Sequence, residues 1–396
     1  MKHQYKTEIR WKRFTQNVLD FFVDIYAKIF IRSKKKSDVN NPKKILFIIL
    51  AQLGDALVMS YVFPFIKERF PNSDIDVLIG EWAEPILKKN PYVKNLIFFN
   101  HFRMNRTKNS ILKKIITHIQ TYQTALNYIR FQKYDLSIEG GVTHPNGNII
   151  TYRGRVKRRI GFGSGGFGSL LSDEVPFPKQ TNFHIMEAIL GELRLIGIYK
   201  TLNDIQPYFY PAKRSFEHSF SNKNVSNINK PYVIVHPESG NNRHLMSKIF
   251  WQEVVKRILK TDDHFIIICG IFYESSTLVE FLLQNVEGSE NRIINAVQKL
   301  SLDELYILSN NAIASITLDS LAAHLCSISC RTLSFYNNGY GRYFFPISGI
   351  HSTVVHNHLP SRQMLNIPKC ESMYVEKFEF KETYDIIEKF LNELTI

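Results

Sequence analysis

Short apolar runs alternate with amphipathic stretches along most of the chain, and this alternation limits the fold more than any other feature. Between Lys43 and Asn100 the pattern predicts strand, helix, strand, helix and strand, beginning with the apolar run Ile45–Leu50. The alternation restarts at Tyr232–His236 and continues to a strand at Thr332–Tyr336. Strands that alternate with helices are typical of parallel sheets with helices on both faces. The sequence therefore predicts an α/β protein with two such sheets.

Length and composition agree with two domains. A chain of 396 residues exceeds the usual size of one domain. Residues 200–230 are polar and rich in Pro, Asn and Ser, which is typical of a linker. We therefore predict an arm over residues 1–42, an N-terminal domain over 43–215 and a C-terminal domain over 216–396. The last predicted helix, Thr383–Leu394, is a candidate for packing back on the N-terminal domain.

The arm is strongly basic and has helical periodicity. Residues 1–44 hold twelve Lys or Arg against four acids, which supplies +8 of the net charge of +14. The apolar positions that recur at helical spacing are Trp11, Phe14, Val18, Phe22, Ile25, Tyr26 and Ile29. Such a helix is too short and too charged to span a bilayer, but it can lie on an anionic membrane surface. Packing on the body of the protein explains the pattern equally well.

Several other functions find no support in the sequence. The charge is accompanied by no nucleic-acid recognition motif. The four cysteines form neither a disulfide framework nor a zinc pattern, and no signal peptide is visible, which favours a reduced, cytoplasmic protein. The glycine-rich run at 161–168 opens no helix and is followed by no acid at a strand end, so we predict a loop there and no dinucleotide site. No acidic pair marks a metal site, and we expect no metal and no cofactor.

Two predicted strand ends carry residue types suited to chemistry. The segment Ile45–Leu57 begins with a strand-like apolar run that ends in Gly54 and Asp55. A later buried run leads into Asp319, Ser320 and, five residues after the acid, His324. In α/β proteins ligands collect where strands turn into helices. We therefore predict two α/β halves that face each other across a cleft.

The chain resembles glycosyltransferase family 9, the bacterial ADP-heptose:lipopolysaccharide heptosyltransferases and their relatives. The matched segments run in family order from about residue 43 to the C-terminus: ILFIILAQLGDAL, FPNSDIDVLIG, NPYVKNLI, YDLSI, HPESG, IIICGIFYE, KLSLDEL and DSLAAHL. The resemblance implies the GT-B fold, which consists of two Rossmann-like domains. It also implies that the N-terminal domain binds the acceptor, that the C-terminal domain binds the nucleotide sugar, and that transfer is metal-independent and inverting.

Sugar transfer needs a base for the acceptor hydroxyl and a cation for the departing diphosphate. The resemblance places the base at Asp55, although an Asp at this position is also a favoured helix cap. It places the phosphate-binding cation at Arg243, with Lys248 as the rival because the alignment gap is uncertain. Arginine keeps the charge of the family's lysine and adds a fork that suits phosphate oxygens. A solvated basic loop is the alternative.

The resemblance also assigns the remaining donor contacts. Ser239 and Gly240 would lie against the phosphates, and Asp319, Ser320 and His324 match the family's donor motif. Glu274 would bind the ribose hydroxyls, and Leu300 would contact the nucleotide base. Ordinary loop and core roles, including a hydrogen-bonded core histidine, remain open for these residues. Leu321 stands where the family usually has Gly, which leaves the identity of the donor open.

Basic residues of the N-terminal half suit an anionic acceptor such as a phosphorylated or Kdo-bearing lipid core. We assign Arg158 and Arg159 to acceptor binding, although a solvated basic surface is an equal alternative. The prediction is an enzyme that moves heptose from ADP-heptose to the lipopolysaccharide core, peripherally bound to the cytoplasmic side of an anionic inner membrane. The alternatives are a family member that uses another nucleotide sugar and a non-catalytic binding protein of the same fold.

Overall fold

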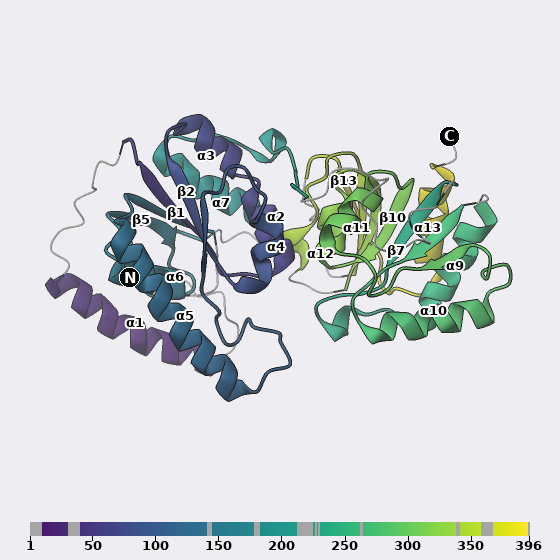
Figure 1. Cartoon of the computed structure of the whole chain (residues 1–396), viewed down its shortest axis with the longest axis horizontal. Helices are drawn as coiled ribbons and strands as arrows, with labels where there is room; N and C mark the ends of the chain where they lie inside the picture. Colours follow the sequence, from purple (N-terminus) through teal and green to yellow (C-terminus); the bar gives the residue numbers. More distant parts are fainter. Residues whose placement is uncertain are drawn as a thin grey trace. The chain divides into compact units, whose positions relative to one another are not determined.

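The computed structural model describes residues 10–30, 40–140, 145–177, 183–211, 225, 228, 230–261, 264–337, 341–357 and 367–394. The chain divides into two compact units, Met1–Asp204 and Ile205–Ile396 (Figure 1). Each unit is built around one sheet in which all the named strands pair in parallel. The two parallel sheets predicted from the alternating pattern are confirmed.

The N-terminal sheet has the strand order β3-β2-β1-β4-β5-β6. Its strands are β1 (Lys44–Ile49), β2 (Asp74–Ile79), β3 (Asn95–Phe98), β4 (Leu136–Glu139), β5 (Arg158–Phe162) and β6 (Asp173–Val175). The central strand β1 is a continuous apolar run because helices cover both faces of the sheet. From Ile45 to Ile49 no side chain is more than 1% exposed.

The helices of this unit surround the sheet. They are α1 (Arg10–Phe30), α2 (Leu53–Ser60), α3 (Phe63–Arg69), η1 (Glu81–Ala83), α4 (Glu84–Leu87), α5 (Ile111–Gln132), α6 (Asn146–Arg153), η2 (Gly168–Leu170), α7 (Ile185–Leu193), η3 (Arg194–Ile196) and η4 (Leu202–Asp204). The single helix predicted over Ala56–Phe70 is two helices, because Pro64 lies in the first turn of α3 and favours a new helix start. In the described part of the chain, none of the helices combines the length and apolarity needed to cross a bilayer.

The C-terminal sheet has the order β13-β12-β11-β10-β7-β8-β9. Its strands are β7 (Tyr232–His236), β8 (Phe265–Ile268), β9 (Ile293–Asn295), β10 (Ala314–Leu318), β11 (Arg331–Tyr336), β12 (Ser352–His356) and β13 (Cys370–Tyr374). Its helices are η5 (Asn242–His244), α9 (Lys248–Thr261), α10 (Tyr273–Asn285), α11 (Leu302–Ser309), α12 (Leu321–Cys326), η6 (Gly341–Phe344) and α13 (Lys381–Asn392).

The last helix, α13, is the one that we considered for packing on the N-terminal domain. Its apolar face lies in the core of the C-terminal unit, where Ile387, Phe390 and Leu391 share one buried cluster with Val254 of α9. An ion pair between Arg257 Nε and Glu388 Oε1 (3.2 Å) also joins α13 to α9. The apolar face of α13 is therefore buried within its own unit.

The boundary between the units falls after Asp204, ahead of the predicted boundary at 215/216. Phe209 packs edge-on against Tyr306 of α11, with ring centroids 5.2 Å apart. This aromatic contact attaches the segment before residue 212 to the C-terminal unit. Residues 212–224, 226, 227 and 229 of the predicted linker lie outside the described residues.

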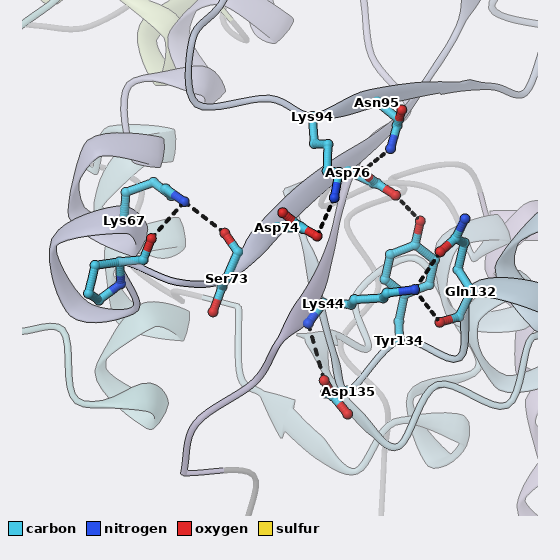
Figure 2. Close-up of polar contacts among 11 residues, drawn as sticks. Lys44, Lys67, Ser73, Asp74, Asp76, Lys94, Asn95, Gln132, Tyr134 and Asp135 are labelled. Carbon is cyan, nitrogen blue, oxygen red and sulfur yellow. Dashed lines mark hydrogen bonds and ion pairs between the residues drawn. The ribbon is translucent and has the colours of Figure 1, made fainter.

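Polar contacts close the amino edge of the N-terminal sheet (Figure 2). The backbone N–H of Lys44 donates to Asp135 Oδ2 (3.1 Å). Asp76 is buried on β2, where it accepts hydrogen bonds from the Tyr134 hydroxyl and from Asn95 Nδ2 (2.9 Å). Burial, and next the bond to Asp76, raise the pKa of Tyr134, so the phenol keeps its proton and donates it to the carboxylate. These contacts hold the N-terminal ends of β1 and β4 against β2.

Replacing Tyr134 with Phe should lower the free energy of unfolding by about 1–3 kcal/mol, because the buried Asp76 carboxylate would lose a donor. Urea unfolding followed by circular dichroism measures the change. Tyr199→Phe is the matched control. Tyr199 is 79% exposed, so water solvates its hydroxyl in both the folded and the unfolded chain, and its removal should change the free energy of unfolding little. Equal unfolding free energies for Tyr134→Phe and the wild type would contradict the structural role given to this bond.

Candidate active site

In the N-terminal unit, the turn from β1 into α2 lies at the carboxyl edge of the sheet. Strands β2 and β3 continue on one side of β1 and β4 to β6 on the other, so the strand order changes direction between β1 and β4. Ile48 pairs with Glu139 at this point, and the N–H of Gly140 donates to the Ile48 carbonyl (2.8 Å). Ligands of open α/β sheets bind at such switch points.

Asp55 is half-buried in the first turn of α2, where its Oδ2 accepts a hydrogen bond from the Gln52 N–H (3.2 Å). A carboxylate three residues into a helix that accepts from the preceding N-cap residue stabilises the helix start. Asp55 therefore caps the start of α2, which is the structural alternative to a role as catalytic base. Neighbouring loops hold the turn, since Gln52 Nε2 donates to the Met104 carbonyl (3.1 Å) and Trp82 Nε1 to the Ala51 carbonyl (2.9 Å).

Two buried glutamates lie in this unit and were not among the predicted site residues. Glu139 ends β4 and is 3% exposed, and Glu192 on α7 is fully buried. Burial, and next the charge of Glu139, raise the pKa of Glu192 well above its usual range. Burial therefore favours the protonated form of the Glu192 carboxyl group. The acid at the end of a buried strand was visible in the sequence, but its pairing with a helical residue 53 positions later was not.

In the C-terminal unit, the loops after four neighbouring strands carry the predicted donor residues. The strands lie in the order β10-β7-β8-β9 and are parallel, so their carboxyl ends share one edge. Ser239, Gly240 and Arg243 follow β7, Glu274 follows β8, Leu300 follows β9, and Asp319, Ser320 and His324 follow β10. The structure thus brings all eight residues to one edge of one sheet.

A hydrogen-bonded group joins the loops after β7 and β10, between which this sheet changes direction. Ser239 Oγ donates to the backbone carbonyl of Asp319 (2.7 Å). His244 Nδ1 lies 3.4 Å from Asp319 Oδ2, and its Nε2 lies 3.2 Å from Asn241 Nδ2. The side chains of His244 and Asp319 are only 13% and 19% exposed. His244 was missed, because its place directly after Arg243 gave no sign that it reaches a residue 75 positions later.

The two cations considered for the diphosphate have different surroundings. Arg243 is exposed in η5, where its backbone N–H donates to Asn241 Oδ1 (3.1 Å). Within the described residues its guanidinium group makes no hydrogen bond or ion pair. Lys248 begins α9, and its Nζ lies over the Phe281 ring of α10, 5.6 Å from the centroid. Arg243 is therefore the better placed of the two to bind an anion.

Glu238, the acid of the HPESG segment, organises the neighbouring loop. It is buried, and it accepts hydrogen bonds from the N–H groups of Ile271 and Phe272 (both 2.8 Å) and from Ser275 Oγ (2.6 Å). These bonds hold the start of α10, whose second residue is the predicted ribose ligand Glu274. The segment was quoted in the sequence analysis, but Glu238 was given no role there. Its contacts indicate that it positions the loop after β8.

The remaining predicted residues differ in exposure. Ser320 precedes α12 and its Oγ donates to the Leu318 carbonyl (3.1 Å), while Leu300 is half-buried and Glu274 is exposed. His324 is 4% exposed; burial lowers its pKa to about 4, and the charge of Asp319 opposes this shift only in part. Its imidazole is neutral at pH 7. Among the residues that the structure describes, no three His, Cys, Asp or Glu side chains are grouped to hold a metal ion.

Arg158 and Arg159, assigned to the acceptor from the sequence, begin β5 at the amino edge of its sheet. Arg158 Nε pairs with Asp173 Oδ2 (2.9 Å). Arg159 donates to the carbonyls of Leu170 (2.8 Å) and Val156 (2.6 Å). Both guanidinium groups thus have structural partners, at the edge of the sheet opposite to the turn that carries Asp55.

The neutral state of His324 makes stability depend on pH. The folded imidazole takes up a proton near pH 4, whereas its ordinary pKa is 6.5, so the unfolded chain binds the proton first as the pH falls. Stability should therefore decrease from about pH 6.5 down to pH 4, with His324 contributing on the order of 2–3 kcal/mol. Urea unfolding between pH 7.5 and 4.5 should show a smaller decrease for His324→Gln than for the wild type. The half-exposed His351 gives the control, His351→Gln; equal pH slopes in all three proteins would contradict the prediction.

Comparison with known proteins bears on the fold. No family model and no curated protein matches the sequence. In structure the chain is similar to a glycosyltransferase family 9 protein from Veillonella parvula (TM-score 0.64, 15% identity, 89% of this chain and 98% of that chain). It is also similar to two E. coli proteins, ADP-heptose lps heptosyltransferase II (0.63, 16%, 89% and 98%) and heptosyltransferase WaaC with ADP (0.59, 13%, 89% and 99%). The chain therefore has the GT-B fold of two Rossmann-like domains that these glycosyltransferases share, as predicted.

Proposed function

We propose that this protein is a glycosyltransferase that binds a nucleotide sugar on its C-terminal unit. The observation that carries the proposal is the gathering of Ser239, Glu274, Leu300 and Asp319 at one carboxyl edge, with the loops after β7 and β10 joined through Ser239. The fold supports it, since one protein of the same fold is described with ADP and another is named for ADP-heptose.

Each donor residue has a chemical task in this proposal. The exposed Arg243 guanidinium binds the diphosphate through paired N–H groups and stabilises the charge that develops on it. Asp319 accepts hydrogen bonds from the sugar hydroxyls, and His244 and Ser239 hold it in place. Glu274 binds the ribose, and Leu300 contacts the base. Arg243 supplies the positive charge that a metal ion provides in other transferases, so the reaction needs none.

Asp55 is the proposed base. Its Oδ2 already accepts the Gln52 N–H, but an ionised carboxylate has about four lone-pair sites, so capping and proton acceptance are compatible. The acceptor hydroxyl gives its proton to Asp55 while its oxygen attacks the anomeric carbon. The bond from that carbon to the diphosphate breaks, and its electron pair leaves with the diphosphate oxygen. Attack from the side opposite to the leaving group inverts the anomeric centre.

We further propose heptose from ADP-heptose as the sugar and a lipopolysaccharide core as the acceptor, on the cytoplasmic side of an anionic inner membrane. The names of the structural neighbours favour this donor. A second candidate is a transfer from another nucleotide sugar, because Leu321 places a side chain where the resembled family usually has Gly. A non-catalytic binding protein is less favoured, because Asp55, Arg243, Asp319 and His324 are all present.

Thermal-shift measurements with ADP, UDP, GDP and CMP test the donor site. We expect ADP alone to stabilise the wild type, by about 2–3 kcal/mol at a hundredfold excess over Kd, and Glu274→Ala to weaken this effect, because Glu274 binds the ribose that ADP carries. Asp385→Ala is the matched control, since Asp385 is an exposed acid on α13 and should leave the ADP response intact. Selective stabilisation by UDP or GDP would overturn the heptose assignment but keep the transferase. No response to any nucleotide would contradict the donor site itself.

A further inference from the structure

Helix α1 lies on the N-terminal unit with its polar side inward. Asp20 is 1% exposed, and its Oδ1 accepts a hydrogen bond from the backbone N–H of Phe167 (2.8 Å). Gln16, one turn earlier, lies against Gly166, where an added Cβ would come within 1.8 Å of its Nε2 and where φ is +106°. The glycine-rich loop at 161–168 therefore seats the polar side of α1.

The apolar side of α1 consequently faces outward. Phe14 is 69% exposed, Phe22 63% and Ile29 61%. The outward apolar residues of the described part of α1 are Phe14, Val18, Leu19, Phe21, Phe22, Ile25, Tyr26 and Ile29. A helix on a water-soluble surface has the opposite arrangement, with apolar residues against the core and carboxylates in water. Because the polar side of α1 faces the protein, the helix exposes its apolar side chains to solvent.

Helix α5 adds a second exposed row. Its last turns are buried in the core through Ala125, Leu126 and Ile129. Its first turns expose Ile111, Leu112, Ile115, Ile116 and Ile119, by 36% to 66%. Packing in the core therefore explains the apolar residues at the C-terminal end of α5, whereas those of its first turns are left exposed.

Both helices are attached to α6 and lie on the same side of the unit (Figure 1). The Tyr26 hydroxyl of α1 lies 3.2 Å from the Tyr152 hydroxyl of α6. The next residue, Arg153, donates through Nη1 to the Tyr122 hydroxyl of α5 (3.1 Å). We call the outward apolar residues of α1 and the first turns of α5 the apolar surface. It is larger than the scattered apolar residues that are normal on a soluble protein.

The surroundings of the apolar surface are positively charged. From residue 101 to 133 the sequence has no Asp or Glu and seven Lys or Arg: Arg103, Arg106, Lys108, Lys113, Lys114, Arg130 and Lys133. Arg103, Arg106, Lys108 and Lys113 are exposed beside or within the first turns of α5, and Lys28 is exposed on α1. The two acids in the described part of α1 are Asp20, which is buried against the glycine-rich loop, and Asp24, which is half-buried. Apolar side chains bordered by cations match the chemistry of an anionic lipid interface.

We propose that the apolar surface of α1 and α5 binds an anionic lipid bilayer, with both helices lying in its interface. This proposal rests on the proposed function, in which the acceptor is anchored in a membrane. It identifies the surface of the enzyme that contacts that membrane. A second copy of the chain is a poorer occupant, because it would bring two sets of cations together. The bilayer covers the apolar side chains and supplies the negative charge that the cations lack.

Cosedimentation with vesicles tests the proposal, using phosphatidylcholine alone and a 3:1 mixture of phosphatidylcholine and phosphatidylglycerol. We expect the wild type to bind the anionic vesicles, more weakly at high salt, and to bind the neutral ones at least tenfold less. Leu112→Glu with Ile116→Glu should lower binding to anionic vesicles at least tenfold, and Phe22→Glu on α1 should lower it too. Tyr199→Glu is the matched control, because Tyr199 is exposed by 79% and lies outside both helices.

Binding of the double variant at the wild-type level, or no binding of the wild type, would overturn the proposal. A wild-type dimer in light scattering that the double variant converts to monomer would assign the surface to a second copy and overturn it as well. Circular dichroism and the ADP thermal shift, both expected to be unchanged in the double variant, show that it is folded. Vesicle binding without any nucleotide response would support the surface and contradict the proposed function, so the two failures are distinguishable.

Discussion

Parallel strand pairing is the constraint on which both candidate sites depend, because it brings every strand-to-helix turn of a unit to one edge of its sheet. In the C-terminal unit this edge collects residues from the loops after β7, β8, β9 and β10. The hydrogen bond from Ser239 to the Asp319 carbonyl then joins the two loops that flank the change in strand order. Glu238 fixes the third loop by accepting three hydrogen bonds at the start of α10. Buried structural contacts thus hold the candidate ligand residues in place.

The two units carry different parts of the proposed reaction. The N-terminal unit supplies Asp55, which sits in a helix start held by neighbouring loops, and it also carries the apolar surface. The C-terminal unit supplies the nucleotide-sugar ligands and the cation for the diphosphate. If the apolar surface binds a bilayer as we propose, an acceptor attached to lipid would reach the enzyme on the membrane that its N-terminal unit already contacts. The membrane surface and the base are therefore assigned to the unit that we propose binds the acceptor.

Much of the fold could be predicted from the sequence, because buried parallel strands are continuous apolar runs such as Ile45–Ile49 and Tyr232–His236. The strands β12 and β13 were not predicted, since Ser352–His356 and Cys370–Tyr374 contain few apolar residues in sequence. The candidate donor residues came from the resemblance, but their partner His244 and the buried Glu192 depend on contacts between distant segments. Periodicity identified the apolar side of α1, but the bond from Phe167 to Asp20 and the exposure of the apolar residues show which side faces the protein.

The most direct test of the account is a transfer assay with ADP-heptose and a deacylated lipopolysaccharide core, read by mass spectrometry. The account predicts a product heavier by one heptose residue, with one ADP released per transfer. Asp55→Asn should slow transfer by about 10²–10⁴-fold and leave the ADP thermal shift intact, because it removes only the base. Asp74→Asn, at the amino edge of the same sheet, should transfer at the wild-type rate. Undiminished transfer by Asp55→Asn would contradict the role given to this carboxylate, and absence of transfer by the wild type from any nucleotide sugar would contradict the central claim.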